Sequence, residues 1–519
     1  MSPRRSPTLD DVLAEHRRAH PARVAVVDGD LRLTYAQLAA RVDRLAGALA
    51  ARGFGPGDRL LWLGQNSFRI LELLLAAGAL GGMVCAANWR QSAEELAFVI
   101  EDFDPALVIW QAGEIGAAVQ AAREAAGARA LWLRHDDDTA GGYEAFVAGG
   151  RPLPAPPRGD AGAPVLVIYT AAFGGRPNGA MLDHAALLAQ AQIMARVEEI
   201  DTGYVYLNCG PLFHIATWMR AIPAFLYGGT NVYTRRVEAE ALCRVIERER
   251  CNGGFILTPT IRDIVALNAD RRHDLSSLRA MQFGDPAVDE AWSAMTHPQR
   301  TPWTRNSQGY GQTELTGQVT LCCIGGPAQG THGWTVPGAQ VRILDPDGAE
   351  VADGEAGEIC VRGPMVTHGY WNRPALNAAR TRGGWWHTTD LGRREPDGSL
   401  SFIGTQARMI KSGNENIYPA EVEACIESHP AVAEAAIIGV PDDRWVQSVK
   451  AIVVLKPGAR AAAEEIVEHC RARMASYKKP RTVEFAAAPL PRAGFVKDHA
   501  ALDARYGGGN YPGGSTRGG

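Results

Sequence analysis

The chain has 519 residues, of which 46% are hydrophobic and 21% are charged, so its composition is that of a globular protein long enough for two or three hydrophobic cores. Its 53 Lys and Arg residues nearly balance 57 Asp and Glu residues, and the net charge of −4 gives no electrostatic case for nucleic acid or for an anionic membrane surface. These values exclude a largely disordered protein and favour an enzyme that acts on small molecules.

Targeting and anchoring signals are not expected in this sequence. Arg4 and Arg5 have no apolar stretch behind them, which argues against a secretory signal. The longest apolar run, residues 71–87, contains Glu72 and several glycines, and it predicts a buried helix running into a strand instead of a membrane span. Nine scattered cysteines form no CxxC pair and no Cys/His cluster at metal spacing. We expect a cytoplasmic protein with reduced thiols and without a zinc site.

Two kinds of hydrophobic pattern divide the chain. From residue 31 to 259, helical stretches alternate with short apolar strands, which predicts parallel sheets covered by helices. The helices are expected over residues 34–52, 94–103 and 187–197, and the strands over 59–63, 106–110, 165–169 and 254–257. Short runs separated by Asp-Gly turns then predict a smaller antiparallel sheet over residues 339–362, with a further strand over 399–403.

A second unit is predicted after Gly404. Its helices are expected over residues 420–428 and 462–474, and its strands over 433–439 and 450–455. We therefore predict an N-terminal domain over residues 1–404 and a C-terminal domain over residues 405–506. The glycine-rich residues 507–519 are expected to form a disordered tail.

Five motifs carry candidate chemistry. Residues 167–182 read VIYTAAFGGRPNGAML, which predicts a strand, a glycine-rich turn and a helix, and clustered glycines can form a backbone nest for phosphate. Residues 309–314 read GYGQTE, in which Tyr310 could stack on a base, Thr313 could reach a phosphate oxygen and Glu314 could hold Mg²⁺. The others lie at residues 384–400, which include Asp390, at residues 412–423, and at residues 490–497, which end in Lys497. Taken singly, each is more often a structural or surface feature.

In this order and spacing, the five motifs resemble those of the adenylate-forming superfamily, which contains acyl-CoA synthetases, the adenylation modules of peptide synthetases and firefly luciferase. The resemblance runs from residue 21 to 505 and takes in PLFH at 211–214, GYW at 369–371 and YKKP at 477–480. It implies an α/β fold with a large N-terminal domain of two α/β sandwich subdomains plus a small β-barrel, and a small mobile α+β C-terminal lid. Such enzymes join a carboxylate to ATP and then transfer the acyl group to a thiol, usually that of coenzyme A.

The resemblance also implies residue roles. Tyr310 would pack on adenine, Asp390 would bind the ribose hydroxyls, and Glu314 would bind Mg²⁺. Lys497, Thr313 and His214 are the implied catalytic residues, Lys497 by offsetting the charge that builds at the carboxylate and α-phosphate. Further contacts to the AMP moiety, to ATP and to coenzyme A are implied for Gly311, Thr170, Gly174, Gly175, Gly179, Gly413, Asn414 and Lys411.

The phosphate loop departs from the family pattern, which is roughly YTSGTTGxPKG. This chain reads YTAAFGGRPNG, so Ala171, Gly174 and Asn178 replace the Ser, the second Thr and the Lys. All six lysines lie past residue 410, so no lysine of the N-terminal domain can compensate. Losing one well-placed donor to a charged transition state costs about 3 to 4 kcal/mol. The hinge, with Gly404-Thr405, and the purine loop, with Phe283-Gly284, also differ from the family, whereas the AMP contacts are better preserved.

Three interpretations stay open. The chain could transfer the acyl group to coenzyme A from an acyl-adenylate that a separate adenylating ligase makes; the eroded loop also resembles that of the non-adenylating ligases of platencin-type diterpenoid pathways. It could instead be a complete ATP-dependent acid:CoA ligase, since the glycines of the nest, Glu314 and Lys497 are retained. A non-catalytic scaffold and a carrier-protein loading module are lesser alternatives; a scaffold would have little reason to keep Tyr310, Glu314, Asp390 and Lys497 together.

The expected substrate is a hydrophobic carboxylic acid without an α-amino group. Amino-acid-activating relatives carry an Asp near the PLFH position, where this chain has Phe213-His214. The residues expected to line the acyl pocket are mostly apolar, which favours a hydrophobic acyl group: His214, Trp218, Phe255, Thr258, Phe283 and Gly309. Trp218 and Phe255 could equally be core residues.

Overall fold

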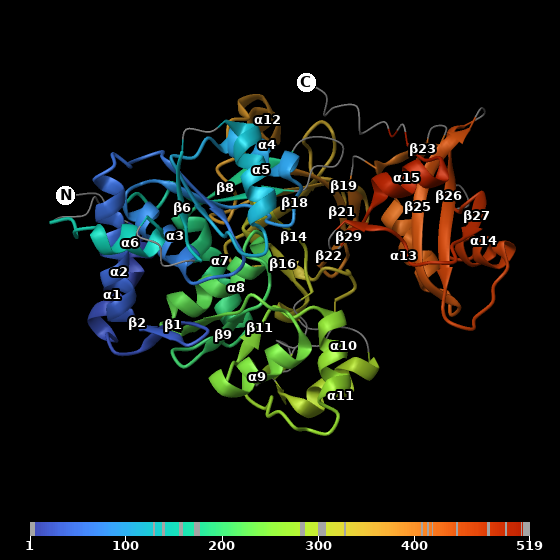
Figure 1. Ribbon diagram of the computed structural model, residues 1–519. Helices are drawn as coiled ribbons and strands as arrows, with labels where there is room; N and C mark the ends of the chain where they lie inside the picture. The colour runs from blue at the N-terminus through green and yellow to red at the C-terminus, as the bar shows by residue number, and fades with distance from the viewer. Residues whose placement is uncertain are drawn as a thin grey trace.

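Figure 1 shows the computed structural model of the chain, in which a large body is followed by a smaller C-terminal part at one side. The structure describes residues 6–127, 130–136, 141–154, 159–170, 177–280, 286–298, 308–325, 328–405, 408–412, 415–417, 419–442, 445–474, 478–493, 496–509 and 511. We call the described residues from 408 onward the lid.

The first layer of the large body is a six-stranded sheet in the order β6-β5-β3-β4-β7-β8, parallel except for β8, which runs antiparallel to β7. Its strands are β3 (Arg59–Leu63), β4 (Met83–Ala86), β5 (Leu107–Trp110), β6 (Leu131–Arg134), β7 (Pro164–Thr170) and β8 (Asn178–Asp183). The accompanying helices are α2 (Tyr35–Ala50), α3 (Arg69–Ala79), α4 (Ala93–Phe103), α5 (Gly116–Ala126) and α6 (Tyr143–Gly149). Strands β4 and β5 are buried along their whole length, as strands covered on both faces are. The apolar run at residues 71–87 forms α3 and β4, as predicted.

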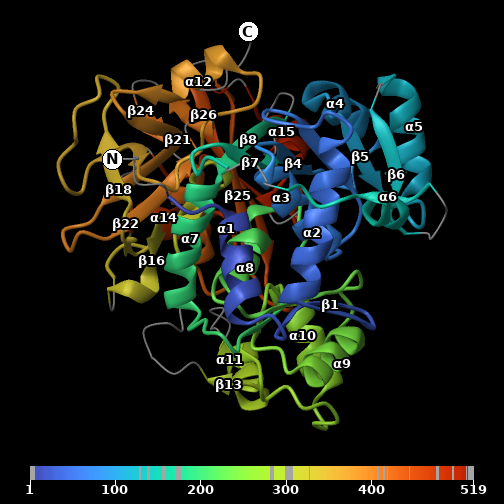
Figure 2. The ribbon, with the colours of Figure 1, turned by 90° about the vertical axis from the view of Figure 1, so that its left-hand side faces the viewer.

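A second sheet has the order β11-β9-β10-β1-β2. Its strands are β1 (Val24–Asp28), β2 (Leu31–Thr34), β9 (Val205–Asn208), β10 (Thr230–Tyr233) and β11 (Gly253–Gly254). The helices of this part are α1 (Leu9–Ala19), α7 (His184–Val197), α8 (Ile215–Leu226), α9 (Ala239–Glu249), α10 (Thr258–Leu267) and α11 (Pro286–Met295). Helices α7 and α8 pack against each other in the centre of the body (Figure 2). The strand predicted over residues 254–257 was wrong in length, because β11 ends at Gly254 and α10 begins at Thr258.

An antiparallel sheet completes the large body, with β18 (Gln340–Leu344), β19 (Ala356–Arg362), β20 (Thr381–Arg382), β21 (Trp385–Arg394) and β22 (Leu400–Thr405), and α12 (Pro374–Arg380) beside it. This confirms the smaller antiparallel sheet that the Asp-Gly turns predicted. Its buried face includes Val341, Ile359 and Trp386. The short pairs are β12 (Arg279–Ala280) with β13 (His297–Pro298), β14 (Gly311–Gln312) with β15 (Gly317–Gln318), and β16 (Thr320–Leu321) with β17 (Trp334–Thr335).

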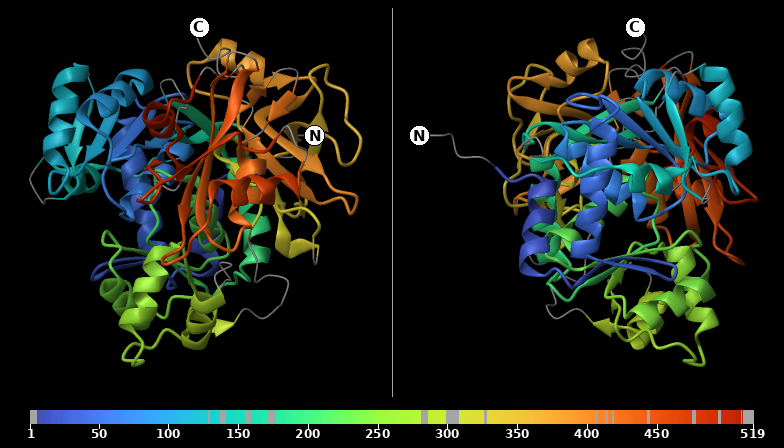
Figure 3. Two further views of the ribbon diagram at one scale, coloured as in Figure 1. Left: turned by 90° about the vertical axis from the view of Figure 1, so that its right-hand side faces the viewer. Right: turned by 60° about the vertical axis from the view of Figure 1, so that its left-hand side comes forward.

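The lid has its own sheet and core, which Figure 3 shows in front in its left-hand view. The sheet contains β23 (Ile410–Ser412), β24 (Glu415–Ile417), β25 (Val432–Asp442), β26 (Val446–Leu455) and β27 (Thr482–Phe485). The remaining elements are α13 (Pro419–Glu427), α14 (Ala463–Arg471), the paired β28 (Arg492–Ala493) and β29 (Val496–Lys497), and α15 (His499–Tyr506). The helix–strand–strand–helix order is the α+β pattern that we predicted.

Two local expectations differ from the structure. The motif at residues 167–182 was predicted to run from a strand through a turn into a helix, but residues 178–183 form β8, which pairs with β7, and α7 begins only at His184. In the expected disordered tail, the Tyr511 hydroxyl accepts hydrogen bonds from the Gly439 amide and the Arg408 guanidinium at 3.0 and 2.9 Å. Burial of a large aromatic ring against the lid offsets the entropy of ordering these residues. The domain boundary at Gly404 stays a prediction.

Among the helices that the structure describes, none is both long enough and apolar enough to cross a bilayer.

Candidate active site

The GYGQTE segment is shaped by two close backbone approaches. A Cβ at Gly309 would lie 1.9 Å from the Thr320 carbonyl oxygen, and one at Gly311 would lie 2.0 Å from the Gly317 carbonyl oxygen. Both separations are far below van der Waals contact, so only glycine fits at these two positions. The turn between β14 and β15 is thereby held tightly, and Thr313 and Glu314 form its first two residues.

Tyr310 joins this turn to the antiparallel sheet. Its ring is buried and stacks on Phe402, with ring centroids 5.8 Å apart, and its hydroxyl donates to Asp390 Oδ2 at 2.8 Å. The Gln312 side-chain amide donates to the same oxygen. The structure therefore brings together two motifs that the sequence identified separately.

Asp390 is a buried carboxylate on β21. Burial raises its pKa to about 6, although the hydrogen bonds from Tyr310 and Gln312 oppose that shift. An ionised carboxylate in this position can accept hydrogen bonds from a ribose diol. Its predicted role is consistent with this geometry and remains a prediction.

The residue before Asp390 has an unusual backbone. Thr389 lies in the left-handed region with φ of 61°, a conformation that favours glycine. Its amide donates to Glu358 Oε1 at 2.9 Å. A β-branched residue is strained in this conformation, so the hydrogen bond to Glu358 helps to hold the segment that carries Asp390.

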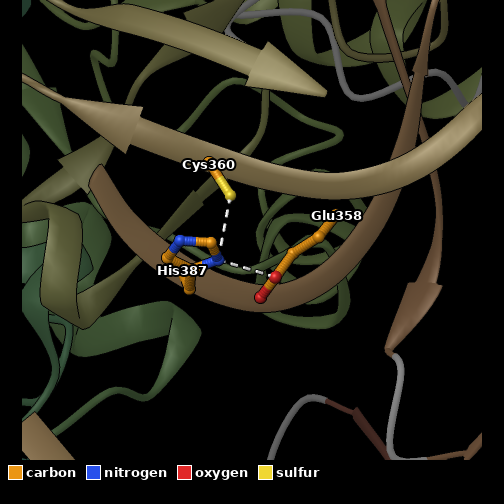
Figure 4. Close-up of side chains that lie close together, drawn as sticks. All are labelled: Glu358, Cys360 and His387. Atoms are coloured by element: carbon orange, nitrogen blue, oxygen red, sulfur yellow. Dashed lines mark hydrogen bonds and ion pairs between the residues drawn. The ribbon is translucent and has the colours of Figure 1, made fainter. Parts of the chain in front are cut away.

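Glu358 belongs to a cluster that the sequence did not reveal (Figure 4). Strands β19 and β21 place Cys360 opposite His387, whose Nδ1 lies 3.3 Å from Cys360 Sγ and 2.8 Å from Glu358 Oε2. The three side chains have the chemistry of metal ligands, but the Arg382 guanidinium lies 3.1 Å from the same nitrogen. We interpret the cluster as a structural group of hydrogen bonds. His387 holds Glu358 in place, and Glu358 in turn accepts the hydrogen bond from the Thr389 amide, next to Asp390.

Glu314 is the candidate Mg²⁺ ligand. Its side chain is buried, and Tyr370 of the GYW element donates a hydroxyl hydrogen bond to Oε1 at 2.6 Å. Mg²⁺ in nucleotide sites commonly takes one or two protein carboxylates together with phosphates and water, so a single carboxylate here fits. When bound, the ion would neutralise part of the charge of the phosphates.

The phosphate loop itself, residues 171–176 with Gly174 and Gly175, lies outside the described residues. On its flanks, the Thr170 hydroxyl donates to the Asn178 carbonyl at 3.3 Å, and Gly179 pairs with Tyr169 across β7 and β8. A Cβ at Gly179 would lie 2.9 Å from a Val167 methyl group. Packing within the hairpin is thus sufficient to require this glycine, and its role in an anion nest stays a prediction.

Arg373 is a charged neighbour of this loop that sequence reasoning missed. Its Nε donates to Asn178 Oδ1 at 3.2 Å, at the position where the family has Lys. The same guanidinium binds Asp102 Oδ1 at 2.7 Å, and Asp102 also accepts a hydrogen bond from the Tyr169 hydroxyl at 2.7 Å. The sequence signal that could have identified Arg373 as a site residue is its position two residues after the GYW element.

The residues expected in the acyl pocket separate into different environments. The Nδ1 atom of His214 accepts from the Ala216 amide at 3.1 Å as the N-cap of α8, and burial lowers its pKa, so the imidazole is neutral at pH 7. Trp218 is only 1% exposed and donates to the Leu212 carbonyl at 2.6 Å. Trp218 is therefore a core residue, which was one of its two interpretations.

Phe255 lies against a buried ion pair that the sequence did not predict. The Arg220 guanidinium is 5.2 Å from the centre of the Phe255 ring, and its Nε contacts Glu198 Oε1 at 2.6 Å. Thr258 begins α10, and Phe283 lies outside the described residues. A guanidinium on one face of Phe255 makes this part of the predicted pocket more polar than expected.

Of the site residues predicted in the lid, two lie within the part of the chain that the structure describes, Lys411 and Lys497. The Lys411 amide on β23 donates to Gln447 Oε1 at 3.0 Å, whereas Gly413 and Asn414 lie outside the described residues. Lys497 is on β29, and its ammonium is bound by acceptors of the lid itself. Its expected contact with the substrate carboxylate and α-phosphate stays a prediction.

The meeting of the Gly-Tyr-Gly turn with Asp390, beside a separate C-terminal lid, places the protein among the enzymes that bind an adenylate. Comparisons with known proteins agree with this class. The chain matches the family described as AMP-binding enzyme over residues 13–371 and its AMP-binding enzyme C-terminal domain over residues 421–494. The chain belongs to the AMP-binding enzymes of the adenylate-forming superfamily, and it is an acyl-CoA synthetase/ligase.

Similar proteins are named for aromatic and fatty acids. A feruloyl-CoA synthase of Amycolatopsis is 35% identical over 475 residues, covering 90% of this chain and 93% of that protein. An indoleacetate–CoA ligase of Aromatoleum aromaticum is 33% identical over 496 residues, covering 94% and 96%. A solved fatty acyl CoA synthetase of Mycobacterium tuberculosis has a TM-score of 0.77 and 27% identity, with 96% of this chain and 98% of that chain covered. These similarities extend over nearly the whole chain and include the lid.

Proposed function

We propose that this protein forms acyl-CoA thioesters from an acyl-adenylate and coenzyme A, and that a separate ligase supplies the adenylate in the cytoplasm. The observation that carries the proposal is the composition of the phosphate loop together with the environment of Asn178. The loop lacks the Ser and the Lys of the family pattern, and Phe173 and Gly174 replace its two adjacent Thr residues, whereas Thr170 is kept. Tyr310, Thr313 and Asp390, the residues that the family resemblance assigns to AMP, are retained, which supports triphosphate handling as the weakened half of the chemistry.

Arg373 does not easily replace the missing lysine. It is the guanidinium beside Asn178, but its ion pair with the largely buried Asp102 neutralises it. To hold a β- or γ-phosphate it would have to leave Asp102, and a buried carboxylate without a partner is costly. Adenylation would then lack the cationic side chain that the family lysine supplies at position 178.

The proposed transfer requires less from the loop. The thiolate of coenzyme A attacks the carbonyl carbon of the acyl-adenylate, a C–S bond forms, and the bond from that carbon to the phosphate oxygen breaks. AMP departs with the electron pair, and the thiol proton passes to solvent. Tyr310 and Asp390 would hold the adenosine during this step, and Thr313 would contact the phosphate. The leaving group is already a good one, so no triphosphate contact is needed.

The test follows acyl-CoA by mass in two parallel reactions with coenzyme A. One contains carboxylic acids with ATP and Mg²⁺; the other contains the synthetic acyl-adenylates of the same acids. The panel covers aromatic, indole, long-chain and diterpenoid acids, because the acyl group is not fixed by the sequence. Product from the adenylates alone supports the proposal, whereas efficient product from acid and ATP overturns it.

A complete ATP-dependent acid:CoA ligase is the second candidate, and the retained Glu314 and Lys497 favour it. The names of the similar enzymes make aromatic acids the first substrates to try. Restoring Ser at Ala171, Thr at Gly174 and Lys at Asn178 separates the two functions. Under the main proposal this triple change raises pyrophosphate release from ATP; under the second candidate the unmodified protein already releases it.

A further inference from the structure

The ammonium group of Lys497 occupies a site built entirely from the lid. Its Nζ contacts Glu423 Oε2 at 2.8 Å and Glu427 Oε1 at 3.1 Å, and it also donates to the Ala435 carbonyl oxygen. The Lys497 side chain is only 16% exposed. The cation therefore has three acceptors, two of them charged, and little contact with water.

The two carboxylates are themselves fixed. Glu423 Oε1 accepts from the Ile437 amide at 2.8 Å, and Glu427 Oε1 accepts from the Ala435 amide at 3.0 Å. Helix α13 and strand β25 thus hold both acids in place before the lysine binds. Burial by itself lowers the pKa of Lys497, but the carboxylates outweigh burial and raise it overall. Charge-assisted hydrogen bonds of this kind are stronger than neutral ones.

The position of the hairpin makes this arrangement relevant to the reaction. In Figure 1, β29 lies on the side of the lid that faces the large body, and α14 and β27 lie on the opposite side. Helix α13, which carries both acids, contacts β22 of the large body, and β22 pairs with β21 at Asp390. The strand that carries Lys497 thus lies on the side of the lid that faces the large body, while the Lys497 ammonium is already bound by two carboxylates of the lid.

We propose that Glu423 and Glu427 are positioning residues that keep Lys497 in a resting site within the lid. Lys497 then acts in adenylation only when it exchanges these acids for the carboxylate and α-phosphate of the substrates. The inference rests on the role in adenylation that the family resemblance implies for Lys497 and that the second candidate function uses. It adds a second restraint on adenylation, independent of the phosphate loop.

Lysine labelling tests the resting site directly, because the chain has only six lysines and each can be followed by peptide mass. Competitive acetylation of the full chain compares Lys497 with the exposed Lys456. We expect Lys497 to react at least tenfold more slowly than Lys456, since each charge-assisted hydrogen bond accounts for about a tenfold factor. Equal reactivity in the unmodified protein would overturn the proposal.

Glu423→Gln and Glu427→Gln should each raise the labelling of Lys497 severalfold relative to Lys456. Glu434→Gln is the matched control, because Glu434 binds Arg492 of the same hairpin and has no contact with Lys497. Glu427 is exposed, so its variant keeps the test available if Glu423→Gln fails to fold. Unchanged labelling in a folded Glu427→Gln protein contradicts the proposed site.

Activity supplies the second readout. The ratio of pyrophosphate release from acid and ATP to acyl transfer from synthetic adenylate should rise in both variants and stay unchanged in Glu434→Gln. A fall in that ratio would show that the acids orient Lys497 for adenylation, contrary to the inference. Adenylation by the unmodified protein tests only the proposed function, and the labelling of Lys497 tests only the resting site.

Discussion

Tyr310 and Asp390 are 80 residues apart in sequence, yet the Tyr310 hydroxyl donates a 2.8 Å hydrogen bond to the Asp390 carboxylate. This contact joins the predicted adenine-binding turn to the predicted ribose-binding strand. Both side chains are buried, so neither can exchange the other for water without cost. The two groups form one unit that can hold an adenosine.

Replacing Tyr310 by phenylalanine (Tyr310→Phe) removes this hydroxyl and keeps the ring. Because a hydrogen bond to a charged group contributes about 1.5–3 kcal/mol, we expect affinity for a non-hydrolysable sulfamoyl analogue of an acyl-adenylate to fall at least tenfold. Isothermal titration calorimetry measures the change. Unchanged affinity would show that the hydroxyl does not organise the nucleotide site.

Binding of the adenosine moiety should depend on the protonation of Asp390. Its pKa is about 6, so below pH 6 the carboxyl group is protonated and loses an acceptor for the ribose hydroxyls. We expect affinity for the same analogue to fall about tenfold between pH 7 and pH 5. The Asp390→Asn protein should bind weakly at both values without that dependence. If the affinity of the Asp390→Asn protein for the analogue fell by the same factor between pH 7 and pH 5, the group that titrates would not be Asp390.

Asp390→Asn should also change stability, with a definite sign. Burial raises the pKa of Asp390 from 3.8 in the unfolded chain to about 6 in the folded protein, so folding disfavours its charged form. This lowers the free energy of unfolding by about 3 kcal/mol at pH values above 6, and the effect disappears below pH 3.8. Urea unfolding should show that the variant has a larger free energy of unfolding than the unmodified protein at pH 8, and that this difference is smaller at pH 5. A larger difference at pH 5 than at pH 8 would contradict the predicted direction.

Thr389→Gly should relieve backbone strain at the segment that carries Asp390. A non-glycine residue in the left-handed region costs about 1–2 kcal/mol, and the added flexibility of glycine in the unfolded chain removes about 0.5–1 kcal/mol of that gain. We expect a net stabilisation of about 0.5–1 kcal/mol by urea unfolding. Asn372→Gly is a comparison, since Asn372 also has positive φ and tolerates it better. A destabilised Thr389→Gly protein would show that the Thr389 side chain is needed.

Much of the fold was accessible from local sequence patterns. The period of the apolar residues identified α2, α3 and β3, because each buries one stripe or one whole strand in the same core. The pattern failed at residues 178–183, where three apolar residues in succession, Ala180 to Leu182, give no alternation and pairing with β7 decided the strand. It also failed at Tyr511, because one aromatic residue in a glycine-rich tail gives no periodic signal, whereas its contacts with Arg408 and Gly439 depend on packing.

The sequence by itself determined the order of the motifs, and with it the family and the residues that bear chemistry. It also exposed the altered phosphate loop, because substitutions within a motif are visible without coordinates. Only the tertiary structure decided which of these groups meet: Tyr310 with Asp390, Arg373 with Asn178, and Lys497 with Glu423. Such contacts depend on strand pairing and packing between distant segments, and hydrogen bonds and ion pairs act over a few ångströms, so spacing along the chain cannot predict them.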